Sequence, residues 1–143
     1  MTTVVFRSGI LAGDTLVSPD KGLTSKLGRN PQGDIAGVAG TLSICQKWLR
    51  AFVRGDEEMP SLRSVTGDKN DDATALVIRK NTKAVEFWEV DGLVEFDAPF
   101  YVIGSGWKWA MGALEAGASA KRAVEIAAKY DSATGGDIEV LKL

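Results

Sequence analysis

Met1-Thr2-Thr3-Val4-Val5-Phe6 is the stretch on which the organisation of this chain depends. Residues 3–7 are mostly β-branched or aromatic, which predicts a strand that starts at the very end of the polypeptide. Thr2 has a small side chain, which permits removal of the initiator Met1. An N-terminal Thr that is held rigidly combines a hydroxyl nucleophile and a free α-amine base in one residue. Thr2 is therefore the first candidate for a catalytic residue.

The length and composition indicate an ordinary globular protein. With 143 residues, 45% of them hydrophobic and 25% charged, we expect one domain over residues 1–143 with a substantial core. The net charge of −2 and a pI near 5.2 argue against a nucleic-acid or anionic-membrane partner. No apolar run has the length of a membrane span, and the N-terminus lacks the features of a signal peptide. We expect a cytoplasmic protein, located in the host cytoplasm if a phage encodes it.

The reactive side chains that are missing restrict the chemistry. The chain has no His and a single Cys, Cys45. A single Cys forms no internal disulfide, which fits a reducing compartment, and its apolar helical context predicts a buried thiol. Without His, a zinc site and a Ser-His or Cys-His pair are excluded. We expect neither a metal nor a cofactor, and a hydrolase built from this chain would need an amine or a carboxylate as its base.

The hydrophobic pattern predicts a mixed chain in the order strands, helix, strands, helices, strand. The expected strands are residues 3–7, 10–15, 26–29, 34–40, 73–79, 84–90, 93–96 and 138–143, and the expected helices are residues 41–55, 107–116 and 119–130. Thr41 is the expected N-cap of the first helix and Gly55 its stop. Helices bunched between antiparallel hairpins favour an α+β fold of two sheets stacked face to face, with helices outside. Residues 56–72 are expected to form a surface loop or one short helix.

Several polar residues stand at the ends of these elements, and each has a structural interpretation of its own. Asp14 could cap a hairpin turn, and Lys26 could be a solvated charge. Ser105 could be the N-cap of the following helix, since its Gly-Ser-Gly motif lacks the further residues of a P-loop or a dinucleotide fingerprint. Asp131 begins a turn that by itself only stops a helix. The functional signal therefore lies in the order of these residues along the chain.

Five stretches carry a family resemblance: Met1-Thr2-Thr3-Val4-Val5, Leu11-Ala12-Gly13-Asp14, Lys26 followed by Ile35-Ala36-Gly37-Val38-Ala39-Gly40, Gly104-Ser105-Gly106, and Asp131-Ser132-Ala133-Thr134-Gly135. In this order they resemble the proteasome β-subunit family of N-terminal nucleophile (Ntn) hydrolases, in particular the bacterial peptidase HslV and the small HslV-like proteins of bacteria and phages. The resemblance spans residues 2–55 and 73–143. It implies the four-layer αββα sandwich of the Ntn-hydrolase fold.

The resemblance assigns the reacting groups. Thr2, after removal of Met1, would attack an amide carbonyl, and its α-amine, with a reference pKa of about 8, would take the hydroxyl proton directly or through water. Lys26 would lower the pKa of this amine by its positive charge, and Asp14 would hold Lys26 charged and oriented. Lys21 is a substitute for this position, although we prefer Lys26. The product would be an ester on Thr2, which water then hydrolyses.

The resemblance also assigns the surroundings of the nucleophile. Ser105 would hydrogen-bond around the amine, and Asp131 with Thr134 would brace the nucleophile from the last turn. The backbone N–H of Gly37 would fill the oxyanion hole, where one donor is typically worth about a hundredfold or more in rate. The pocket for the substrate side chain would be lined by Ile35 and Ala39. Such a lining implies an apolar preference.

At the level of function, the resemblance implies a threonine peptidase in a ring-shaped homo-oligomer, with unfolded polypeptide as substrate and an ATPase unfoldase as a partner. Two alternatives stay open: a non-catalytic structural or assembly member of the same fold, and a small-molecule amidase with the same nucleophile. A retained Met1 would leave no free amine on Thr2 and would favour the first alternative. Family subunits have a second long helix after the first, whereas residues 56–72 are few and rich in charge. We expect this covering helix to be missing or reduced.

Overall fold

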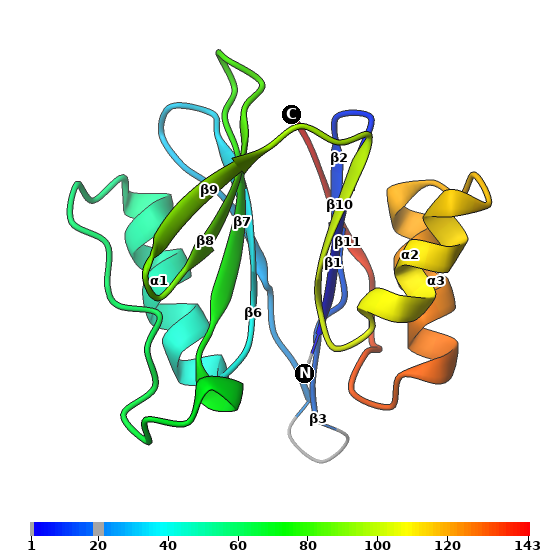
Figure 1. The fold of residues 1–143 in the computed structure, drawn as a ribbon, viewed down its shortest axis with the longest axis horizontal. Helices are drawn as coiled ribbons and strands as arrows, with labels where there is room; N and C mark the ends of the chain where they lie inside the picture. Colours follow the sequence, from blue (N-terminus) through cyan, green and yellow to red (C-terminus); the bar gives the residue numbers. More distant parts are fainter. Residues whose placement is uncertain (1, 19–21) are drawn as a thin grey trace.

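The computed structural model describes residues 2–18 and 22–143, and in this part of the chain two antiparallel sheets lie face to face between outer helices (Figure 1). The first sheet has the order β10 (Phe100–Gly104), β1 (Thr3–Arg7), β2 (Ile10–Gly13), β11 (Glu139–Lys142). The second has the order β5 (Leu27–Arg29), β6 (Ile35–Ala39), β7 (Thr74–Ile78), β8 (Val85–Glu89), β9 (Gly92–Phe96). The second sheet is covered by α1 (Leu42–Arg54), and the first by α2 (Trp107–Glu115) and α3 (Ala120–Tyr130). The predicted αββα sandwich is confirmed.

The connecting segments differ in part from the sequence-based expectations. Residues 99–105, which lie outside all the predicted strands and helices, contain the edge strand β10. The short strands β3 (Leu16–Ser18) and β4 (Gly22–Leu23), which also lie outside the predicted strands, pair with each other. Residues 56–72 contain no α-helix and only the 3₁₀ helix η1 (Lys69–Asp71), so the second covering helix is missing, as expected.

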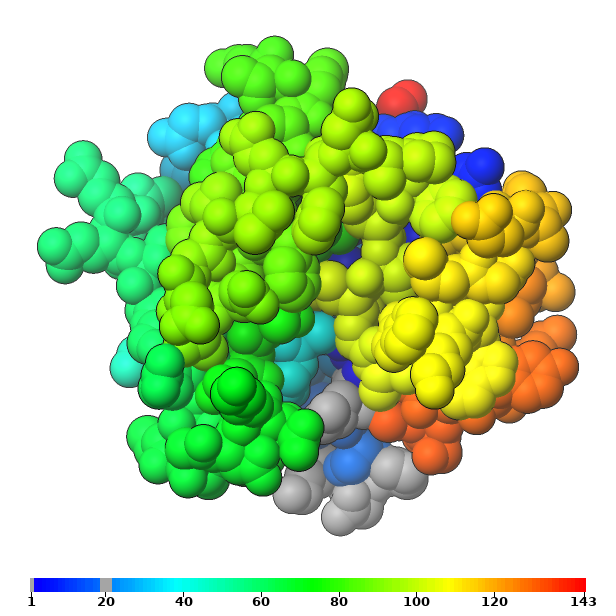
Figure 2. Space-filling model, viewed as in Figure 1, coloured from blue at the N-terminus to red at the C-terminus, as the bar shows by residue number. Residues whose placement is uncertain are grey.

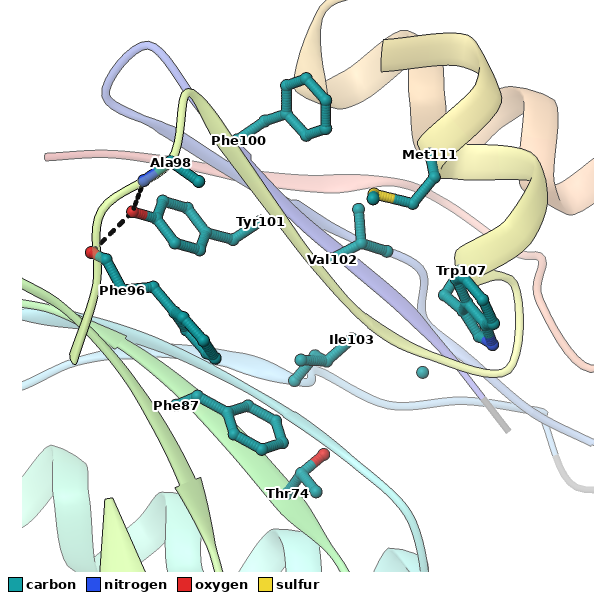
Figure 3. Close-up of a pocket in the computed structure, with 11 residues that line it drawn as sticks. Thr74, Phe87, Phe96, Ala98, Phe100, Tyr101, Val102, Ile103, Trp107 and Met111 are labelled. Carbon is teal, nitrogen blue, oxygen red and sulfur yellow. Dashed lines mark hydrogen bonds between the residues drawn. The ribbon is translucent and has the colours of Figure 1, made fainter. Parts of the chain in front are cut away.

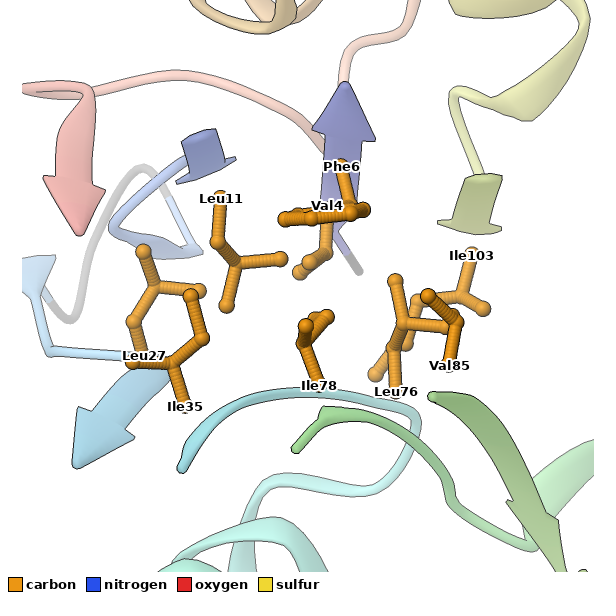
Figure 4. Close-up of a cluster of buried hydrophobic side chains, with 10 residues drawn as sticks. Val4, Phe6, Leu11, Leu27, Ile35, Leu76, Ile78, Val85 and Ile103 are labelled. Carbon is orange, nitrogen blue, oxygen red and sulfur yellow. The ribbon is translucent and has the colours of Figure 1, made fainter. Parts of the chain in front are cut away.

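The strand β1 lies between β10 and β2, and its two faces are both buried. Val4 and Phe6 point into the core between the sheets, as Figure 4 shows, whereas Val5 packs in the cluster beneath α3. Successive side chains of a strand point to opposite faces, so a strand that is covered on both sides has a continuous apolar run. Burial of each such side chain contributes about 1.5–3 kcal/mol. This burial fixes the start of the chain in the centre of the molecule.

The helix α1 packs one apolar face on the second sheet, where Trp48 stacks on Phe52 with ring centroids 5.5 Å apart. Its end is set by Gly55, which has a left-handed φ of 80° and donates a backbone hydrogen bond to Phe52. Thr41 occupies the N-cap position with an extended backbone, as predicted. Its side chain does not cap the helix, however, because the hydroxyl donates to the Asp71 carbonyl at 2.6 Å. Among the described residues, no helix is long and apolar enough to cross a membrane.

Candidate active site

Thr2 precedes β1 and is held between the two strands that flank it. The registers of β1 pair Val4 with Gly13 and Thr3 with Gly104, so the residues after these glycines, Asp14 and Ser105, lie on either side of Thr2. The hydroxyl of Thr2 donates to the Asp14 carboxylate. The Thr2 nitrogen donates to Ser105 Oγ at 3.2 Å. Thr2 is 1% exposed, so both of its functional groups are fixed in a buried setting.

The Asp14 carboxylate is the centre of the hydrogen bonds on the hydroxyl side. Its side chain is fully buried and accepts from the backbone N–H groups of Thr3 and Gly135, each at 3.0 Å, in addition to the Thr2 hydroxyl. Lys26 Nζ lies 3.1 Å from each carboxylate oxygen. A buried carboxylate is tolerated when its oxygens are paired and hydrogen-bonded in this way.

Lys26 precedes β5, and its side chain is 6% exposed. Nζ also donates to the Leu16 carbonyl at 2.7 Å. Burial lowers the pKa of Lys26 below its ordinary value, although the charge and hydrogen bonds of Asp14 act in the opposite direction. The predicted pair of Asp14 and Lys26 is thus present in the structure. The substitute Lys21 and the initiator Met1 lie outside the described residues.

On the nitrogen side, a chain of hydroxyl groups leads to Asp131. Ser105 Oγ and Thr134 Oγ1 each donate to Asp131 Oδ2 at 2.6 Å. Because Ser105 gives its proton to Asp131, its oxygen is available to accept from the Thr2 nitrogen. Burial disfavours the Asp131 carboxylate, but the hydrogen bonds from Ser105 and Thr134 outweigh this effect and lower its pKa. Thr134 also shares a hydrogen bond of 2.8 Å with the hydroxyl of Thr3, a site residue that the sequence analysis missed.

A cavity of about 170 Å³ opens beside Thr2. Its walls include Lys26 and six apolar side chains: Leu16, Val17, Val38, Ala39, Leu42 and Cys45. Burial raises the pKa of the Cys45 thiol to about 12, so this side chain is a neutral, apolar part of the wall. The cavity can therefore accept an apolar group next to the Thr2 hydroxyl.

The N-terminus of α1 lies at the same cavity, which Gly40 and Thr41 also line. No side-chain hydrogen bond caps this helix. The backbone N–H groups of a first helical turn have no partner within the helix, and the helix dipole places partial positive charge there. These groups form a site that can stabilise an oxyanion close to Thr2.

Two sequence-predicted site residues lie elsewhere. Ile35 is fully buried in the core between the sheets and does not line the cavity (Figure 4). Gly37 sits in the middle of β6, where an added Cβ would lie 2.5 Å from the Val4 side chain. Residues 35, 37 and 39 share one face of the strand, but only Ala39 is close enough to its end to reach the cavity. Gly40, three residues after Gly37, is the glycine of this segment that lines the cavity.

The stacked sheets and the outer helices identify the fold, which is that of the proteasome-like Ntn hydrolases. In particular, the fold is that of HslV and BPH. Thiobacillus denitrificans BPH in complex with epoxomicin has a TM-score of 0.66 and 20% identity over 99% of this chain and 98% of its own.

Two further solved structures give the same result. A second structure of Thiobacillus denitrificans BPH has a TM-score of 0.65 and 21% identity, over 99% of this chain and 97% of its own. HslV from Trypanosoma brucei has a TM-score of 0.60 and 17% identity, over 99% of both chains. The sequence matches no protein-family model and no curated protein. The predicted resemblance is therefore confirmed by the fold.

Proposed function

We propose that this chain, once Met1 has been removed, is an N-terminal threonine hydrolase that cleaves peptide bonds. The observation that carries the proposal is the position of Thr2. Its hydroxyl is bound to the buried Asp14–Lys26 pair, and it opens on a cavity beside an uncapped helix N-terminus. A nucleophile, a nearby positive charge and an oxyanion site thus surround one point, as acyl transfer requires.

In the proposed first step, the Thr2 hydroxyl attacks the carbonyl carbon of the substrate. The α-amine of Thr2 takes the hydroxyl proton, directly or through water, and then gives it to the leaving amine as the C–N bond breaks. The chain of Ser105 and Asp131 orients the Thr2 nitrogen for this role. The positive charge of Lys26 favours the neutral amine, which is the form that acts as base. Water then hydrolyses the ester on Thr2 and restores the free hydroxyl.

The negative charge that develops on the carbonyl oxygen needs a donor. The backbone N–H of Gly40, at the start of α1, fits this role better than that of Gly37, because Gly40 lines the Thr2 cavity. One such donor contributes about a hundredfold to a thousandfold in rate. The apolar walls of the cavity, including Ala39, would take the side chain on the acyl side of the cleaved bond.

The test combines the mass of the intact protein with peptide cleavage. We expect a mass without Met1 and cleavage of internally quenched peptides that carry a medium-sized apolar residue. Thr2→Ala should abolish cleavage, whereas Thr2→Ser, which keeps a hydroxyl, should retain measurable activity. Mature protein without cleavage, or cleavage that is unchanged in Thr2→Ala, would refute the proposal. Retention of Met1 in the native source would favour the non-catalytic alternative, and turnover of small amides alone would favour an amidase.

We extend the proposal to a ring-shaped homo-oligomer that receives unfolded polypeptide from an ATPase. The support is the edge strand β9, where Leu93, Val94 and Phe96 are 45–47% exposed. An exposed apolar edge strand is a surface for association. Native mass spectrometry should show a closed oligomer, and Leu93→Lys should shift it toward smaller species. A monomer at micromolar concentration would rule out the ring.

A further inference from the structure

A second, larger cavity of about 490 Å³ lies between the edges of the two sheets. Figure 2 shows this face hollowed between the β9 and β10 segments. Phe87 and Phe96 come from the second sheet, Tyr101 from β10, and Trp107 and Met111 from α2 (Figure 3). Among the residues described for this cavity none is charged, and its volume is that of a site for a small apolar group.

The Tyr101 hydroxyl in this cavity wall already has hydrogen-bond partners within the protein. The Tyr101 hydroxyl donates to the Phe96 carbonyl at 2.8 Å and accepts from the Ala98 N–H at 2.7 Å (Figure 3). With no counter-ion in the wall, a charged group would lose hydration without compensation. Aromatic and aliphatic groups of a ligand, in contrast, are stabilised by contact with the aromatic rings that line the cavity.

The larger cavity reaches the Thr2 site at two points. Gly104 lines it and pairs with Thr3 across β10 and β1, and there is no room for a side chain between Gly104 and the Thr2 carbonyl. Thr74 lines it as well and pairs with Ala39, which belongs to the smaller cavity. The two cavities therefore meet the surroundings of Thr2 at different residues, the larger one at Gly104 and the smaller one at Ala39 and Gly40.

The chemistry decides which part of a substrate lies on which side. The acyl carbonyl must lie at the smaller cavity, where the Thr2 hydroxyl and the start of α1 meet. The leaving amine must lie near the group that protonates it, the Thr2 nitrogen. This nitrogen is bonded to Ser105, the residue that follows Gly104. The leaving side of the substrate is thus directed toward the larger cavity.

We propose that the larger cavity binds a bulky apolar side chain, preferably aromatic, on the leaving side of the cleaved peptide bond. This inference rests on the proposed function and adds a second specificity site to it. It defines the substrate class as polypeptide segments with apolar residues on both sides of the cleaved bond. Trp107 and Met111, which are 49% and 37% exposed, form the accessible wall.

The test compares internally quenched peptides that differ only in the first residue on the leaving side, which is Phe, Ala or Glu. We expect kcat/KM to be about tenfold higher for Phe than for Ala, in the range that extra apolar contact provides, and lowest for Glu. Trp107→Ala and Met111→Ala should reduce the Phe-to-Ala ratio to about threefold or less. Trp109→Ala is the matched control, because Trp109 is 39% exposed on the same helix but stacks on Tyr130.

Each outcome has a clear meaning. Thr2-dependent cleavage with equal rates for Phe and Ala, or an equal effect of Trp109→Ala and Trp107→Ala, would overturn the inference and leave the peptidase intact. If Trp107→Ala changes the oligomeric mass but not the Phe-to-Ala ratio, a second copy of the chain covers the cavity and the inference is wrong. If no peptide is cleaved by the mature chain, the proposed function fails and the inference fails with it.

Discussion

Replacement of Lys26 by Met tests whether the buried ion pair next to Thr2 holds the site together. Met has a similar length but no charge and no donor. In Lys26→Met, the fully buried Asp14 carboxylate would keep its three other donors, from Thr2, Thr3 and Gly135, and would lose its counter-ion. Removal of one partner of a buried pair costs about 3–5 kcal/mol, because the remaining charge is left uncompensated.

The remaining hydrogen bonds place the expected loss at the lower end of this range, at about 3 kcal/mol of unfolding free energy. For a chain of 143 residues this corresponds to a fall of about 10 °C in Tm. Urea denaturation of Lys26→Met, Asp14→Asn and the double variant measures it. In the double variant both charges are gone, so we expect a coupling energy of about 1.5 kcal/mol or more between the two sites.

An exposed ion pair serves as the control. Arg54 and Asp56 are 2.7 Å apart, but their side chains are 61% and 38% exposed, so Arg54→Met should leave stability nearly unchanged. The reasoning would be refuted if Lys26→Met lost less than about 1 kcal/mol while the double-variant cycle was additive, since the pair would then be no more coupled than independent sites.

Three further predictions address single residues. Cys45 should react with iodoacetamide at pH 8 only after unfolding, because a pKa of about 12 instead of 9.0 reduces the thiolate fraction roughly a thousandfold. Gly104→Ala should abolish cleavage and lower stability, since φ is +102° and the new Cβ would collide with the Thr2 backbone, whereas Gly112→Ala, in open space on α2, should be neutral. The stability difference between wild type and Asp131→Asn should be complete at pH 7 and should decline only as the pH falls below the ordinary Asp pKa of 3.8 and through the lowered pKa of Asp131 in urea denaturation, because this group stabilises the fold only while it is ionised; a difference that is already lost at neutral pH, or that grows as the pH falls, would contradict this cause.

Local patterns predicted most of the fold. The apolar run of β1, the helical periodicity of α1 and the Gly55 stop are properties of neighbouring residues, and each appears in the structure within a residue or two of its predicted bounds. The edge strand β10 was not predicted as a strand. Its pairing partner, β1, is almost a hundred residues away in the sequence, and the apolar stretch 99–105 alone does not reveal it.

The family resemblance predicted the contact between Asp14 and Lys26, but the sequence did not reveal which residues of β6 reach the cavity beside Thr2. Asp14 and Lys26 needed only to be in contact, and they are. The choice between Gly37 and Gly40 depends on which residues between β6 and α1 lie at the cavity. The residue types alone do not reveal this. The prediction that Ile35 lines the cavity is wrong for the same reason. Ile35 shares a strand face with Ala39, but it lies too far from the end of the strand to reach the cavity.

The turn after α3 links the two sides of Thr2. Asp131 accepts from Ser105, which holds the Thr2 nitrogen, and the Gly135 N–H donates to Asp14, which holds the Thr2 hydroxyl. A shift of this turn would therefore disturb the proposed base and the proposed nucleophile together. The two groups belong to one residue and must keep one relative geometry for proton transfer, so a common support is better suited to them than two independent ones. This explains why residues at the far end of the chain are needed to position its second residue.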